Sequence, residues 1–236
     1  MKFDIYEEAI TNILKHLSLH NLSATFFIVG RDIKINKNVR EVVKNIINLG
    51  HDVGNHTQNH SRNYHKLTQN EASLEIINNH ELIKKEFNYL CTKFRAPGYN
   101  FRKDQISTLE NLGYKFEDST WPSTIVPALN LYFRIVAKSS KRIDYAWQKI
   151  IQGESTLNFR RIIVTKWLKS PFHVTFLGVY PKIVIRFLLK VKLIEGEIFL
   201  IHAKDYLSSN GNKERLMNKI DLILKFIANE NKNLRN

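Results

Sequence analysis

The alternation of strand-like and helix-like segments constrains the fold of this chain more than any other feature. Short apolar or β-branched runs are typical of buried strands, and the longer stretches between them carry apolar residues at helical spacing. Such runs occupy residues 24–30, 52–54, 94–97, 114–119 and 197–202. Strands that alternate with helices favour an α/β fold with a parallel sheet, and 236 residues suffice for one such domain.

Several helix ends are marked by local signals. Gly50 and Gly113 each follow a stretch with helical periodicity, in the usual position of a C-cap glycine. Thr68 and Glu71 form a capping-box pattern ahead of another helix. The last helix carries its apolar residues between positions 216 and 227. The whole chain, 1–236, is therefore interpreted as a single domain, with a basic, aromatic elaboration at about 123–196.

Two histidines, His56 and His60, follow the second expected strand. Four residues apart, they can face the same side of one helical turn. Neutral imidazoles suit zinc and similar divalent ions, and a third protein ligand would leave one position open for water. Gly54 and Asn55 favour a tight bend at a strand end, where loops that carry sites begin. The pattern indicates the skeleton of a metal-dependent hydrolase.

A second pair, His16 and His20, has the same spacing, so the spacing alone proves little. Ile13, Leu14 and Leu17 mark the apolar face of that stretch, and both histidines fall on the opposite face. We therefore expect His16 and His20 to be a solvated, structural pair.

Composition excludes some classes of protein and leaves others open. Cys91 is the only cysteine, which excludes an intramolecular disulfide framework and a cysteine-based zinc site. Residues 1–5 show no signal-peptide core, and no run of 18 uncharged apolar residues could span a membrane. These features favour a cytoplasmic protein.

The net charge of +14 is concentrated in residues 134–192, which hold thirteen Lys and Arg but two acids. This segment is also rich in aromatic residues. It can be a solvated face, or it can attract anionic lipid headgroups, phosphorylated ligands or nucleic acid. Because the chain has no recognised nucleic-acid motif, nucleic acid ranks last and is not expected as a partner.

Several motifs occur in a distinctive order along the chain. They are SATFFIVG at 23–30, GHDVGNHTQNH at 50–60, FRAPGY at 94–99, DS at 118–119 with Pro122, and LIHA at 200–203. Together they resemble the polysaccharide deacetylases of the NodB-homology type, carbohydrate esterase family 4. The resemblance covers about residues 1–122 and again 197–207. It implies a distorted (β/α) barrel of about seven strands, with its site at the carboxyl ends of the strands.

The resemblance also implies a metal centre. In the family a divalent metal, usually zinc, is bound by two histidines and one aspartate, and it polarises the amide carbonyl and a bound water. Carried over to this chain, His56 and His60 are metal ligands. Asp4 can be either the third ligand or the base that takes a proton from the water, and we favour the base. His202 is the general acid that protonates the leaving amine.

Other positions receive supporting roles from the same resemblance. Arg95 is expected to orient the base Asp4 through a charge-assisted pair, and Asp118 to support Arg95. The N–H of Gly98 is the candidate oxyanion donor. Tyr99 and Trp121 are expected to contact the substrate.

The chain departs from the family at its first motif. The family carries a Thr-Phe-Asp-Asp-Gly element, or an Asp-x-Asp/Glu variant, on its first strand, and residues 2–7 (KFDIYE) are the matching stretch. The second carboxylate is absent at Ile5 and Tyr6, and Glu7 or Glu8 could replace it only if the loop bends back. Three interpretations stay open, in this order: a complete but divergent enzyme, an N-terminally truncated chain, and a family member that no longer catalyses.

The implied reaction is the hydrolysis of a carbon–nitrogen bond in a linear amide. The enzyme would remove an N-acetyl or N-formyl group from an amino sugar of a polysaccharide or a lipid-linked glycan. The alternative is a degenerate or truncated relative that binds glycans. The basic, aromatic segment favours a substrate on an anionic carrier, with the protein peripheral at the inner membrane face. The sugar, the acyl group, the metal and the oligomeric state stay open.

Overall fold

Strands and helices alternate through the first half of the chain. In the computed structural model the described residues are 3–61, 63–120, 135, 155–161, 163–166, 172, 180–206 and 212–233. The first half contains α1 (Phe3–Leu19), β1 (Thr25–Ile28), α2 (Gly30–Ile35), α3 (Lys37–Asn48), β2 (Asp52–Asn55), η1 (Tyr64–Lys66), α4 (Gln69–Phe87), β3 (Lys93–Phe94), η2 (Pro97–Tyr99), η3 (Lys103–Gln105), α5 (Ile106–Asn111) and β4 (Phe116–Thr120). The second half contains β5 (Asn158–Arg161), β6 (Val164–Thr165), α9 (Lys182–Lys190), β7 (Ile194–Glu195), η4 (Ala203–Tyr206) and α10 (Asn212–Asn233).

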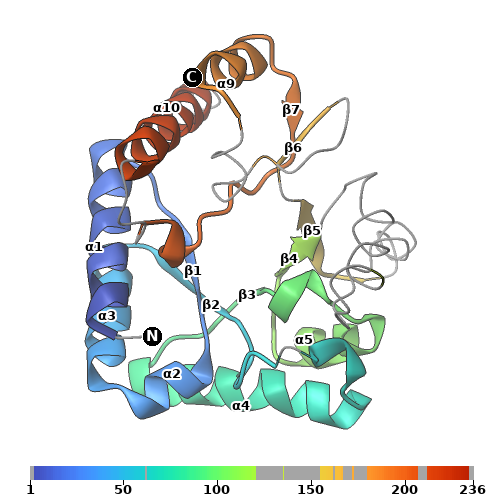
Figure 1. Cartoon of the computed structure of the whole chain (residues 1–236). Helices are drawn as coiled ribbons and strands as arrows, with labels where there is room; N and C mark the ends of the chain where they lie inside the picture. Colours follow the sequence, from blue (N-terminus) through green and yellow to red (C-terminus); the bar gives the residue numbers. More distant parts are fainter. Residues whose placement is uncertain are drawn as a thin grey trace.

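Strands β1 to β5 form one parallel sheet in sequential order, and β6 pairs with β7 in an antiparallel ribbon. Parallel strands joined by helices in sequence order are the topology of (β/α) barrels. In Figure 1 the strands run through the middle of the molecule, with helices around their outside. The expected α/β class with a parallel sheet is confirmed. Of the described helices, not one is both long and apolar enough to cross a bilayer.

The local signals at helix ends act as expected. Thr68 Oγ1 accepts the Glu71 N–H at 3.3 Å, and Glu71 Oε2 accepts the Thr68 N–H at 2.7 Å, which completes a capping box at the start of α4. Gly50 and Gly113 follow α3 and α5 with φ of 75° and 78°. Since this left-handed conformation is unfavourable for residues with a Cβ, both glycines stop their helices where the sequence predicts.

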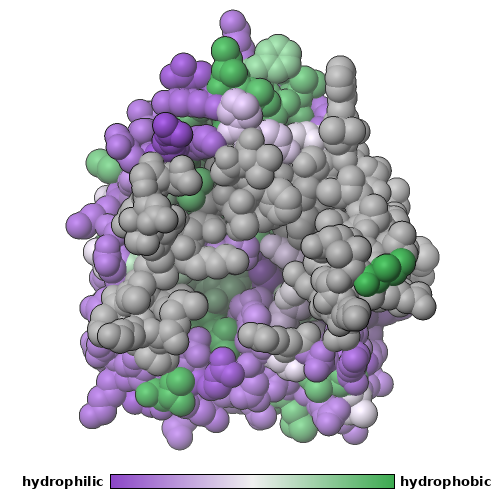
Figure 2. All heavy atoms as spheres, in the orientation of Figure 1, coloured by the Kyte–Doolittle hydropathy of each residue, from purple (hydrophilic) through white to green (hydrophobic). Residues whose placement is uncertain are grey.

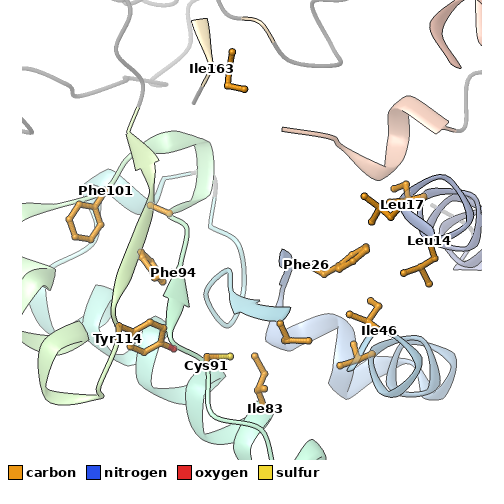
Figure 3. Packing of buried hydrophobic residues seen from close by; sticks show 14 of the residues in the cluster. Leu14, Leu17, Phe26, Ile46, Ile83, Cys91, Phe94, Phe101, Tyr114 and Ile163 are labelled. Carbon is orange, nitrogen blue, oxygen red and sulfur yellow. The ribbon is translucent and has the colours of Figure 1, made fainter. Parts of the chain in front are cut away.

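The core lies between the sheet and its helices (Figure 3). Leu14 and Leu17 of α1 approach Phe26 of β1 from one side, and Ile46 of α3 packs beside them. A second group lies farther along the sheet and contains Ile83, Cys91, Phe94, Phe101 and Tyr114. The core thus fastens the helices to the outer face of the sheet and leaves the carboxyl ends of the strands to carry polar side chains.

Two segments differ from their expected structure. Residues 197–202 do not form a regular strand, because Gly196, at φ 121°, ends β7 and the segment makes a single bridge at Ile198. The opening residues, which match a first-strand motif, instead begin α1. The physical reason is the buried helical stripe of Ala9, Ile13 and Leu17, spaced four residues apart, which draws the preceding turn into the same helix.

Candidate functional site

The two histidines of the second motif lie side by side just beyond the carboxyl end of β2. Their ring centroids are 4.7 Å apart, with an edge-to-face angle of 69°. They are not brought together by a helical turn, as the spacing suggested. Thr57 and His60 instead have φ of 65° and 51°, so two left-handed residues fold the chain into a bend. Because left-handed residues with a Cβ are uncommon, other contacts must hold this bend.

Asn55 supplies those contacts. Its fully buried amide donates to the Ile76 carbonyl at 2.9 Å and to the Tyr114 hydroxyl at 2.8 Å. Its Oδ1 accepts the Thr57 N–H at 2.8 Å and the Asn79 amide at 2.9 Å. Four hydrogen bonds from one buried side chain therefore tie the bend to the chain at α4 and just before β4. The sequence predicts Asn55 as part of a tight bend with Gly54, but it does not predict these four hydrogen bonds.

The ring of His56 has a defined proton arrangement. Its Nδ1 lies 2.7 Å from the backbone oxygen of Arg95. Since a carbonyl oxygen can only accept, Nδ1 carries the proton and Nε2 presents a lone pair. Desolvation, reinforced by the charges of His60, Arg95 and His202, lowers the pKa of His56 to about 3 and keeps the ring neutral. A neutral imidazole whose other nitrogen donates to a carbonyl is the usual form of a metal-ligating histidine.

Arg95 is buried beside this pair. Its guanidinium lies 4.6 Å from the centre of the Phe27 ring, and its Nε donates to the backbone oxygen of Asp118 at 2.9 Å. Desolvation lowers the pKa of Arg95, and the negative charge of Asp118 opposes that shift. Its Nη2 has no hydrogen-bond partner within the described part of the chain. A buried donor of this kind suits an anionic or carbonyl oxygen.

The expected partner of Arg95 is Asp4, which lies in the first turn of α1. The Asp4 side chain lies outside the described part of the structure, so the Arg95–Asp4 pair stays a prediction. Trp121, the expected substrate contact, lies outside the described residues.

Asp118 supports Arg95 through its backbone, while its carboxylate pairs with a residue that the sequence analysis missed. Arg160 of β5 donates from Nε to Asp118 Oδ1 at 2.7 Å and from Nη2 to Oδ2, and its guanidinium lies 4.7 Å from the Phe116 ring centre. The sequence pattern indicates Arg160 only as a member of the basic segment. The alternation of buried Leu157 and Phe159 with the exposed Asn158 between them could have predicted β5.

The Arg-Ala-Pro loop is fixed from β4. Ser119 Oγ accepts the Ala96 N–H at 2.7 Å, and the Ser119 N–H donates to Glu117 Oε1 at 2.8 Å. Glu117 is fully buried, and burial raises its pKa to about 8. The loop then turns through Gly98 and Tyr99, with φ of 62° and 64°. The candidate oxyanion donor and the candidate substrate contact are thus both in a tight turn.

His202 comes to the same region from the far end of the chain. It is half-buried, directly precedes η4, and lies close enough for its charge to lower the pKa of His56. The structure therefore brings together His56, His60, Arg95 and His202. Among the side chains described, no third His, Cys, Asp or Glu joins the two histidines in a metal-binding group.

The first half of the chain matches a known protein family. The family described as polysaccharide deacetylase matches residues 2–116, a stretch that contains both the histidine bend and the Arg-Ala-Pro loop. These residues belong to the polysaccharide deacetylase family, NodB type. Over 92 residues the chain is 37% identical to the peptidoglycan-N-acetylglucosamine deacetylase of Bacillus cereus. That stretch is 39% of this chain and 32% of that protein, so the match spans about a third of the relative's length.

Solved structures extend the likeness in fold beyond the family match. A CE4 family pseudoenzyme from Bacillus anthracis is similar over 93% of this chain and 56% of its own, with a TM-score of 0.54 and 18% identity. A mutant of that pseudoenzyme with restored enzymatic activity gives a TM-score of 0.54 at 19% identity, over 93% of this chain and 58% of its own. At this identity the likeness establishes the fold alone, and it covers the second half of the chain as well.

Proposed function

We propose that this polysaccharide deacetylase domain is a metal-dependent hydrolase that removes an N-acyl group from an amino sugar of a glycan. One observation carries the proposal. The neutral ring of His56 donates its Nδ1–H to the Arg95 carbonyl, which leaves the Nε2 lone pair available, and the ring lies next to that of His60. The relative from Bacillus cereus supports an N-acetylglucosamine unit as the first substrate to test.

The donor set fits a divalent cation, and zinc is the metal we propose. His56 and His60 would hold it, with Asp4 as the third ligand or as the base. When bound, such a cation supplies Lewis-acid chemistry that polarises an amide carbonyl and acidifies water. The residues of the chain then have separate tasks, because the metal does not orient the sugar or protonate its nitrogen.

Those tasks follow from position. Arg95 supplies a fixed positive charge, and its Nη2, which has no hydrogen-bond partner among the described residues, can hold an anionic oxygen, including the carboxylate of Asp4. The Gly98 N–H would donate to the oxyanion, and His202 would give a proton to the departing amine. Tyr99 and Trp121 would contact the sugar. A cytoplasmic location and a lipid-linked form of the substrate remain predictions from the sequence.

A second candidate is a glycan-binding member of the family that has lost catalysis. It is favoured by two observations: the opening motif lies in α1 instead of a strand, and the described residues provide two metal ligands and not three. A pseudoenzyme with this fold shows that the fold can exist without activity.

The test is acetate release from N-acetylglucosamine oligomers by the zinc-loaded protein. We expect the parent to release acetate, and His56→Ala, Asp4→Asn and His202→Ala each to be slower by about 100-fold or more. His16→Ala, in the structural pair, should keep the parent rate. Saturable oligomer binding without acetate release would select the second candidate, and neither binding nor release would reject both.

A further inference from the structure

Helix α9 carries apolar side chains on the side that faces solvent. Ile183, Phe187 and Val191, four residues apart on and just beyond the helix, are 77%, 57% and 44% exposed, and Val184 between them is 36% exposed. Single exposed apolar residues are ordinary on a protein surface, but four in one stripe form a patch. Figure 2 shows apolar and hydrophilic atoms side by side at the top of the molecule, where Figure 1 places α9.

This stripe is not the face that holds α9 to the protein. Ile185 and Leu189 are buried and belong to the core cluster, and α9 contacts α10. At about 100° per residue, Ile185 and Leu189 lie on the side of the helix away from Phe187. The exposed stripe is therefore a second apolar face, separate from the packing face.

Basic residues border the stripe. Lys182, Arg186 and Lys190 are exposed on α9, and Lys192 follows it. Lys192 is paired with Glu230 of α10 at 3.2 Å, while the sequence from 180 to 193 contains no acid. Arg186 directly precedes Phe187, and Lys190 follows it by three residues, which is less than one helical turn. Their charges therefore lie at the edge of the apolar stripe.

We propose that the exposed face of α9 docks the protein on an anionic lipid bilayer. A helix with an apolar face and a basic border is the pattern of segments that lie in the membrane interface, where the apolar residues enter the headgroup region and the cations meet anionic lipids. The alternative of a symmetric dimer through α9 would bring Arg186 and Lys190 near the same residues of the second copy, and α9 offers no acid to compensate them. Charge complementarity therefore favours lipid.

The test measures how the whole protein partitions onto vesicles of phosphatidylcholine with and without phosphatidylglycerol. We expect binding to the anionic vesicles that weakens at high salt, as screening requires. Ile183→Ser with Phe187→Ser should reduce the partition coefficient by about tenfold or more, because both exposed residues lose their apolar contact with the bilayer. Arg186→Gln with Lys190→Gln should also reduce it by about tenfold, since each charge contributes to lipid attraction.

The matched controls lie on α4. Leu74 is 53% exposed, and Lys84 and Lys85 are exposed near the end of that helix. Leu74→Ser and Lys84→Gln with Lys85→Gln should leave binding within about twofold of the parent, because neither is part of an apolar stripe with a basic border. Equal loss in the control variants, or no binding at low salt, overturns the proposal. An oligomer that the α9 variants convert to monomer, without lipid binding by the parent, would assign the face to a second copy and also overturn it. The readout is independent of deacetylation.

Discussion

Two histidine pairs with the same four-residue spacing have different surroundings in this protein. His16 lies on the regular helix α1 and His20 lies in the turn directly after it; His16 Nδ1 is 3.0 Å from the Tyr206 hydroxyl, and His20 Nε2 is 2.9 Å from Asp221. His56 and His60 lie in an irregular bend, with their rings 4.7 Å apart. In the first pair each ring has a partner of its own on η4 or α10. In the second pair the two rings contact each other edge to face.

The comparison shows that equal spacing in the sequence does not decide which groups two histidine rings contact. The backbone conformation around each pair decides it. The expectation that His16 and His20 are structural is confirmed, but the expectation that they are solvated is wrong. The side chain of His20 is 10% exposed, and its ring meets Asp221 of the C-terminal helix α10 at 2.9 Å. A helix face that looks polar in the sequence can still be an interface when a distant segment supplies hydrogen-bonding partners.

The largest expected difference between the pairs is in metal affinity. His56→Ala should weaken Zn²⁺ binding by about 100-fold or more, because it removes a ligand whose orientation the Arg95 carbonyl fixes. The double variant His16→Ala with His20→Ala should leave affinity within about twofold, since both rings already have other partners. Isothermal titration with Zn²⁺ measures both. Equal affinities in all three proteins would show that the bend is not a metal site.

The next effect concerns the side chain that holds the bend. Asn55→Ala should lower the free energy of unfolding by about 3 kcal/mol, because it removes four hydrogen bonds and leaves buried groups unpaired. Urea unfolding gives this value. Asn45→Ala, at an exposed position of α3, is the control and should stay within about 0.5 kcal/mol of the parent. A similar small effect for both would mean that the bend does not depend on Asn55.

The third effect tests the support of the Arg-Ala-Pro loop, whose carbonyl orients His56. Burial raises the pKa of Glu117 from 4.5 to about 8, so folding favours its neutral form. The stability that this neutral carboxyl contributes is complete below about pH 4.5 and is lost as the pH rises through about 8. Glu117→Gln stays neutral and keeps an oxygen for the Ser119 N–H. It should therefore be more stable than the parent by at least about 2 kcal/mol near pH 9, since each unit of raised pKa corresponds to about 1.4 kcal/mol.

The control for that experiment is Glu7→Gln on the exposed side of α1. Thermal or urea unfolding of the three proteins across this pH range gives the comparison. The advantage of Glu117→Gln should shrink as the pH falls toward about 4.5, because the Glu117 carboxyl then becomes neutral in the unfolded chain as well as in the folded protein. A constant difference at all pH values would contradict the assignment of a neutral buried carboxyl.

The sequence by itself determined the elements whose signals are local. The capping box at Thr68, the stops at Gly50 and Gly113, and the short strands that begin the sheet depend on residues a few positions apart. For the same reason His56, His60 and Arg95 could be placed at the ends of strands. Local signals suffice there because backbone propensity and capping act within one turn or one strand.

Only the tertiary structure decided which of these residues meet and what each one contacts. Asp118 and Arg160, 42 positions apart, form a partly buried pair that no local pattern marks, and His20 and Asp221 meet across 201 positions. Residues 197–202 look like a strand, yet β6 offers a two-residue partner and Gly196 turns the chain. The physical reason is that hydrogen bonds and ion pairs between distant segments depend on how the sheet and helices pack, and that packing is a property of the whole chain.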